Sequence, residues 1–119
     1  MAFLKVENEK YLFIRYEPEE MLDQKNLKTE LLAESESGKA RDTVLQFTNA
    51  TAIYSMEIGI IVQFLKTLHG GGRTLRLVVS NYVCEMLKTM NIHKIPNLVL
   101  YNNLEAVQGD CPEIDLSGL

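Results

Sequence analysis

Ser55 is the residue of this sequence whose side chain is best placed for covalent modification or helix capping. It stands in the tetrapeptide Tyr54-Ser55-Met56-Glu57, directly before a long apolar stretch with helical periodicity. A hydroxyl at a helix start can accept a hydrogen bond from a first-turn N–H group, as an N-cap does. The same position favours an anion, because these N–H groups and the helix dipole are electropositive. Two roles therefore stay open for Ser55, a phosphoacceptor and an ordinary N-cap.

The neighbours of Ser55 are candidates for contact with a partner. Tyr54 and Met56 lie on either side of the serine. If their side chains are exposed, they are candidates for contact with a partner. The alternative is that both side chains are partly buried at the edge of a sheet. Glu57 falls in the same first turn, where its carboxylate would repel a phosphate on Ser55.

No residues have the spacing of a catalytic or metal centre. His69 and His93 lack ligand partners at helical spacing. Cys84 and Cys111 are far apart and have no CxxC spacing, so we expect reduced thiols. The glycines at 70–72 end a helical stretch and lack the Lys-Ser/Thr of a P-loop, so they predict a helix-ending turn. We therefore expect no enzymatic activity, no metal and no cofactor.

Length and charge narrow the class of protein. The chain has 119 residues, enough for one domain with a core of its own. Its net charge of −4 gives no basic footprint for direct nucleic-acid binding. No apolar run reaches the ~18 residues of a membrane span, and no signal peptide is recognisable at the start. These features predict a cytoplasmic protein without membrane insertion.

Apolar periodicity predicts alternating strands and helices. Strands are expected at 3–6, 11–16, 43–47, 74–79 and 98–100, the first two forming a hairpin. Helices are expected at 21–34, 56–69 and 82–90, and in a short final segment with Asn102 and Glu105 as a capping box. This alternation predicts an α/β fold with a mixed, mainly parallel sheet of four or five strands and helices mainly on one face. We expect one domain at 1–108 and a loosely ordered tail at 109–119.

In the order and spacing of these elements, the chain resembles the STAS domain, the fold of bacterial anti-sigma-factor antagonists. One matching pattern is the apolar strand and loop that lead to Ser55 and then to Ile58-Gly59-Ile60. The others are the glycine-rich turn and strand at 70–78 and the helix and turn at 83–95. The resemblance covers roughly residues 3–107 and implies the STAS fold.

The resemblance also implies a regulatory binding protein. Its partner would be an anti-sigma factor that is a serine kinase of the histidine-kinase-like ATPase class. In phosphorylated members of the family, a serine at this loop-to-helix junction is modified, which points to Ser55. The expected contact surface is Tyr54 to Glu57. Glu17 and Glu19 are either a further contact or a solvated loop.

The chain departs from the family motif around this serine. Phosphorylated members have an aspartate before the serine, a small hydroxyl residue after it and then a glycine. Here the corresponding residues are Tyr54, Met56 and Glu57. The usual aspartate of the preceding strand is Gln46. The alternative function is therefore a non-phosphorylated STAS adaptor subunit of a signalling or transport assembly.

Overall fold

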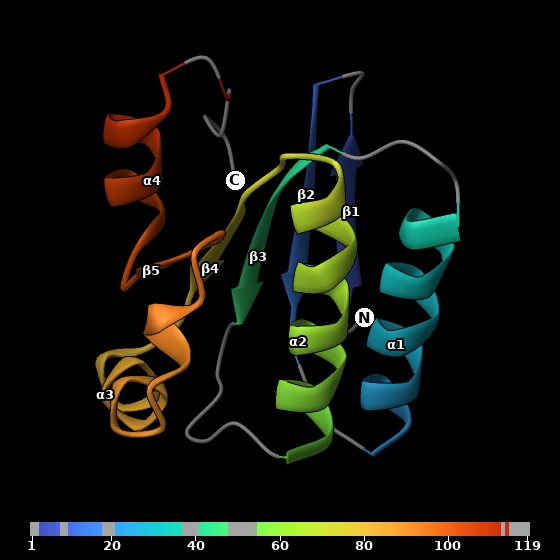
Figure 1. Ribbon diagram of the computed structural model, residues 1–119, viewed down its shortest axis with the longest axis horizontal. Coiled ribbons are helices and arrows are strands. Elements are labelled where there is room, and N and C mark those ends of the chain that lie inside the picture. The colour runs from blue at the N-terminus through green and yellow to red at the C-terminus, as the bar shows by residue number, and fades with distance from the viewer. Residues whose placement is uncertain are drawn as a thin grey trace.

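The computed structural model describes residues 3–7, 10–17, 21–36, 41–47, 55–112 and 114. In these residues, strands and helices alternate along most of the chain (Figure 1). The strands are β1 (Phe3–Glu7), β2 (Tyr11–Tyr16), β3 (Asp42–Phe47), β4 (Leu75–Val78) and β5 (Leu98–Tyr101). The helices are α1 (Met21–Glu36), α2 (Ser55–Gly70), α3 (Asn81–Thr89) and α4 (Leu104–Asp110), with a short 3-10 helix η1 (Ile92–Lys94).

The five described strands form one sheet in the order β1-β2-β3-β4-β5. β1 pairs antiparallel with β2, as the expected hairpin requires. The remaining neighbours pair in parallel, and Leu45 of β3 lies between Ile14 of β2 and Leu77 of β4. The prediction of a mixed, mainly parallel sheet is confirmed. Its central strands are apolar on both faces because both faces are covered.

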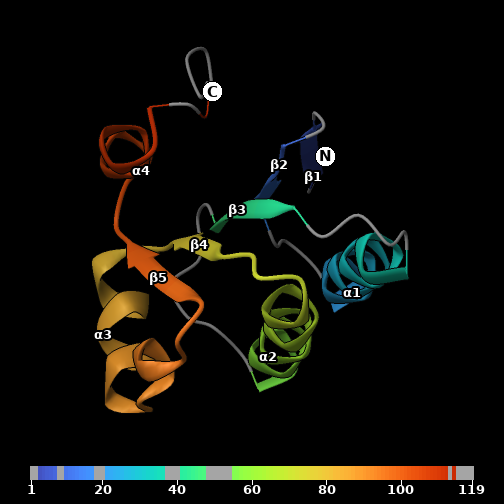
Figure 2. The same ribbon diagram turned by 45° about the horizontal axis from the view of Figure 1, so that its top comes forward.

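Helices cover the two faces of the sheet unequally. Figure 2 shows α1, α2 and α3 on one side and α4 on the other. On the three-helix side, Leu12 and Leu45 pack in one core with Leu27 of α1, Leu65 of α2 and Val83 of α3. Because successive strand residues point to opposite faces, residues adjacent to these in the strands belong to the second core. That core joins Phe13, Val44 and Val78 to Val107, Cys111 and Ile114.

Three helix starts, those of α2, α3 and α4, differ from expectation by one residue. Ser55 is the first residue of α2, one position later in the helix than an N-cap would stand. At α4 the N-cap is Asn103, whose side chain accepts from the Ala106 N–H at 2.8 Å, and not Asn102. Asn103 has the extended backbone that a cap requires (φ −160°, ψ 161°).

Two other helix ends follow from local chemistry. Ser80 is the N-cap of α3 and accepts from the Val83 N–H at 3.2 Å. After α2, the left-handed position is Gly72 (φ 69°) and not Gly70. There a glycine avoids the steric cost that other residues would carry. The glycine run is thus a helix-ending turn, as expected.

The segment after Gly109 is packed where it was expected to be loose. Gly109 and Asp110 belong to α4, and Cys111 and Ile114 are each 3% exposed. The Gln108 side-chain amide donates to the carbonyl oxygens of both Cys111 and Ile114. For these residues the expectation of loose order is wrong, because the apolar second face of the sheet needs cover.

Candidate partner-binding site

Ser55 and Glu17 lie at one edge of the sheet. Parallel strands carry their carboxyl ends to the same edge, and Figure 1 shows α1 and α2 both beginning at the end toward which β2 and β3 point. Ser55 is exposed at the start of α2. Glu17 directly follows β2 and is half-buried. Topology therefore brings the candidate phosphoacceptor and one candidate acidic contact to the same side of the domain.

The remaining candidates divide sharply by burial. Met56 is 45% exposed, as a partner contact requires. Glu57 is only 1% exposed, so the structure corrects the expectation that it contacts a partner. Tyr54 and Glu19 lie outside the described residues.

Helix geometry explains the burial of Glu57. Residues four, seven and eleven positions later share its face of α2, and these are Ile61, Phe64 and Leu68, all buried against the sheet. A carboxylate in the first turn of a helix interacts favourably with the helix dipole. The start of α2 therefore holds a buried acidic group two residues after the exposed Ser55 hydroxyl.

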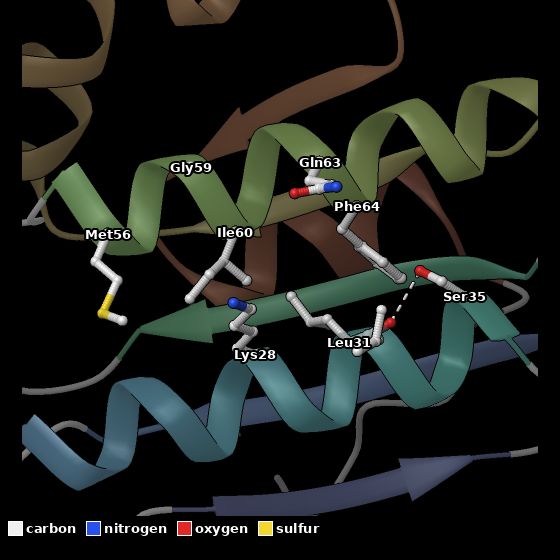
Figure 3. Close-up of a pocket in the computed structure, with 9 residues that line it drawn as sticks. Lys28, Leu31, Ser35, Met56, Gly59, Ile60, Gln63 and Phe64 are labelled. Atoms are coloured by element: carbon white, nitrogen blue, oxygen red, sulfur yellow. Dashed lines mark hydrogen bonds between the residues drawn. The ribbon is translucent and has the colours of Figure 1, made fainter.

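A groove between α1 and α2 runs beside this site. It encloses about 380 Å³. In Figure 3, the side chains of Lys28, Leu31, Ile60 and Phe64 extend into the space between the two helices. Met56, next to Ser55, also lines the groove. The groove therefore extends an apolar surface from the start of α2 along both helices.

We did not predict this groove from the sequence, although the sequence contains a signal for it. Leu31 and Leu32 are consecutive apolar residues of α1, and adjacent helical residues point about 100° apart. Leu31 is 2% exposed in the core, whereas Leu32 is 51% exposed and lines the groove. Two consecutive leucines on a half-buried helix thus indicate an apolar surface beyond the core.

The described part of the chain contains neither a metal-binding cluster of side chains nor a helix that could span a membrane. No cluster of three or more His, Cys, Asp or Glu residues there could hold a metal ion. Cys84 and Cys111 are free cysteines. None of the helices in the described ranges has the length and apolar character needed to cross a bilayer.

Solved structures with the same arrangement of elements identify the fold. A candidate anti-sigma factor antagonist from Thermotoga maritima superposes with a TM-score of 0.75 at 18% identity, over 91% of this chain and 92% of the other. The chain has the STAS fold. A STAS-domain protein from Planctomyces limnophilus gives a TM-score of 0.70 at 16% identity, over 90% and 96% of the two chains.

The STAS fold is also that of SpoIIAA. Its unphosphorylated form matches with a TM-score of 0.68 at 13% identity, over 96% of this chain and all of the other. A structure of SpoIIAA from Bacillus in the phosphorylated form matches with a TM-score of 0.63 at 15% identity, over 92% of this chain and 99% of the other. No protein-family model and no curated protein matches the chain. The similarity is therefore one of fold.

Proposed function

We propose that this STAS domain is an anti-sigma-factor antagonist that acts by binding and performs no chemistry of its own. Its partner is an anti-sigma factor of the histidine-kinase-like ATPase class, and the complex forms in the cytoplasm. The observation that carries the proposal is the exposed Ser55 at the first residue of α2, on a fold shared with structures of anti-sigma-factor antagonists.

Phosphorylation of Ser55 by the partner is the proposed switch. The first-turn N–H groups of α2 have no partners within the helix and favour an anion at this point. A phosphate adds about −1.5 to −2 charges at pH 7. On an exposed surface next to Met56, that charge would weaken docking without disturbing the core.

Buried Glu57 favours a second candidate, an adaptor that is never phosphorylated. Its carboxylate occupies the same first turn as Ser55. A phosphate on Ser55 would therefore share that turn with another negative group, which opposes the modification. In this alternative, the same edge of the domain binds its partner constitutively.

One experiment separates the two candidates. The protein is incubated with ATP and a purified anti-sigma factor of the kinase class, and its intact mass is measured. The switch predicts the gain of one phosphoryl group by the parent and none by Ser55→Ala. Ser55→Ala should bind the partner like the parent, and Ser55→Asp more weakly.

Both variants should remain folded, because the Ser55 side chain is exposed. No phosphoryl gain, together with equal affinity of all three proteins for the partner, would contradict the switch and leave the adaptor.

A further inference from the structure

The groove between α1 and α2 is a mainly apolar surface that the folded domain leaves open. Lys28, Leu31 and Leu32 line it from α1, and Met56, Ile60 and Phe64 from α2. Leu32 is 51% and Met56 45% exposed, although large apolar side chains are usually covered. We propose that this groove binds an acidic amphipathic helix of a partner protein, and that this binding requires no phosphorylation of Ser55.

The dimensions of the groove suit a helix. Its lining residues recur at helical spacing, from Lys28 to Ser35 on α1 and from Met56 to Phe64 on α2. At 1.5 Å per residue, these stretches are about 10–12 Å long, or two helical turns. A ligand helix of that length presents apolar residues at positions i, i+3 or i+4, and i+7, which is the pattern of helix-in-groove recognition.

Gly59 keeps part of the groove open (Figure 3). Glycine inside a helix is destabilising relative to alanine, so a glycine here calls for a reason. Close packing is not the reason, because a Cβ atom at Gly59 would meet no atom within 4 Å apart from its chain neighbours and the adjacent backbone of α2. The open space beside Gly59 is instead available to a side chain of the bound helix.

The charge of the groove selects an acidic ligand. Lys28 is exposed and lines the groove, and exposed Lys25 lies one turn before it on α1. No Asp or Glu belongs to the described lining. The local charge is thus positive, although the whole chain has a net charge of −4.

The same charge disfavours a second copy of this chain as the occupant. A two-fold dimer presents the same patch on both subunits. Two grooves that faced each other would bring together two Lys28 side chains, with no acidic residue in the described lining to compensate. A helix with apolar residues on one side and carboxylates at its flanks avoids this repulsion.

Two matched, fluorescently labelled peptides test the proposal. Both are helical and carry the same leucine stripe, but one is flanked by glutamate and the other by lysine. Fluorescence anisotropy should show that the parent binds the glutamate peptide more tightly. Lys28→Glu should weaken binding of that peptide by about fivefold, the scale of an exposed charge pair, and strengthen binding of the lysine peptide.

Two groove variants test the site itself. Gly59→Leu should fill the groove and reduce peptide binding by about tenfold or more, the scale of a buried apolar anchor. It should remain folded, because leucine is the better helix former. Leu32→Glu should also lose binding, whereas Met90→Glu should not. Met90 matches Leu32 in exposure, at 51%, but lies at the end of α3.

Three results would overturn the proposal. The first is equal affinity of the parent for the two peptides. The second is an equal loss of binding in Leu32→Glu and Met90→Glu. The third is a concentration-dependent dimer that Leu32→Glu dissociates, which would make a second copy the occupant. Ser55→Ala should keep full peptide binding, so failure here is distinguishable from failure of the phosphorylation switch.

Discussion

Arg41 donates two hydrogen bonds to Glu34, from Nε to Oε2 at 2.8 Å and from Nη2 to Oε1 at 2.6 Å. Both residues are 7% exposed. Arg41 also donates to Glu7 of β1 at 2.8 Å. The hydrogen bond to Glu34 is the main cause that raises the pKa of Arg41. This buried pair joins the last turn of α1 to the residue before β3.

Arg41→Met should destabilise the domain by about 3–5 kcal/mol, because it removes one partner of a buried ion pair and leaves the other charge uncompensated. Urea unfolding followed by circular dichroism measures this change. The control is Arg41→Met combined with Glu34→Leu, which should recover most of the loss since no buried charge remains. Equal stability of the single and double variants would contradict this explanation.

Ionisation of Tyr101 should lower the free energy of unfolding at high pH. Its hydroxyl donates to Asp110 Oδ2 at 2.7 Å. Burial, followed by this hydrogen bond, raises the pKa of Tyr101 above its ordinary value of about 10. The folded state then holds the phenol proton more tightly than the unfolded state does. This contribution is complete below pH 10 and is lost as the pH rises through the folded-state pKa.

Tyr101→Phe removes that proton-linked contribution. The free energy of unfolding of the parent should therefore decline more steeply above pH 10 than that of the variant. Urea titrations at a series of pH values measure both slopes. Parallel curves for the two proteins would refute the link between Tyr101 and this decline.

Leu65→Asp should unfold the domain. Leu65 is 2% exposed in the core beneath α2. A buried, unpaired carboxylate costs several kcal/mol, comparable with a total stability of roughly 5–15 kcal/mol. Gln63→Asp introduces the same residue two positions earlier, at an exposed site, and should change stability by only about 0.5 kcal/mol. Similar melting temperatures for the two variants would show that α2 does not bury Leu65.

Asn103→Ala should destabilise α4 and its core by about 1 kcal/mol, the cost of losing an N-cap. Asn102 is the matched control. Its exposed side chain donates to Asn81 Oδ1 at 2.8 Å and caps no helix, so Asn102→Ala should cost less. Thermal unfolding of the two variants tests the assignment. A larger loss in Asn102→Ala would restore Asn102 as the cap.

The order of elements and the class of fold could be predicted from the amino-acid sequence alone. Its strands are short apolar runs separated by turn residues, and its helices have apolar residues at intervals of three and four. These patterns arise from the local geometry of each element and need no knowledge of its neighbours. The position of Ser55 at a helix start followed for the same reason, to within one residue.

Which side chains of each element are covered depends on how the elements pack against one another. Periodicity places Glu57 near Ser55, but packing of α2 on the sheet turns Glu57 inward and leaves Ser55 outside. Leu31 and Leu32 are consecutive apolar residues of α1, but the spacing of α1 and α2 buries Leu31 and leaves Leu32 beside an open groove. A sequence pattern shows which residues share a side of one element. How far a neighbouring element covers that side depends on contacts between segments distant in the chain, and a local pattern does not contain those contacts.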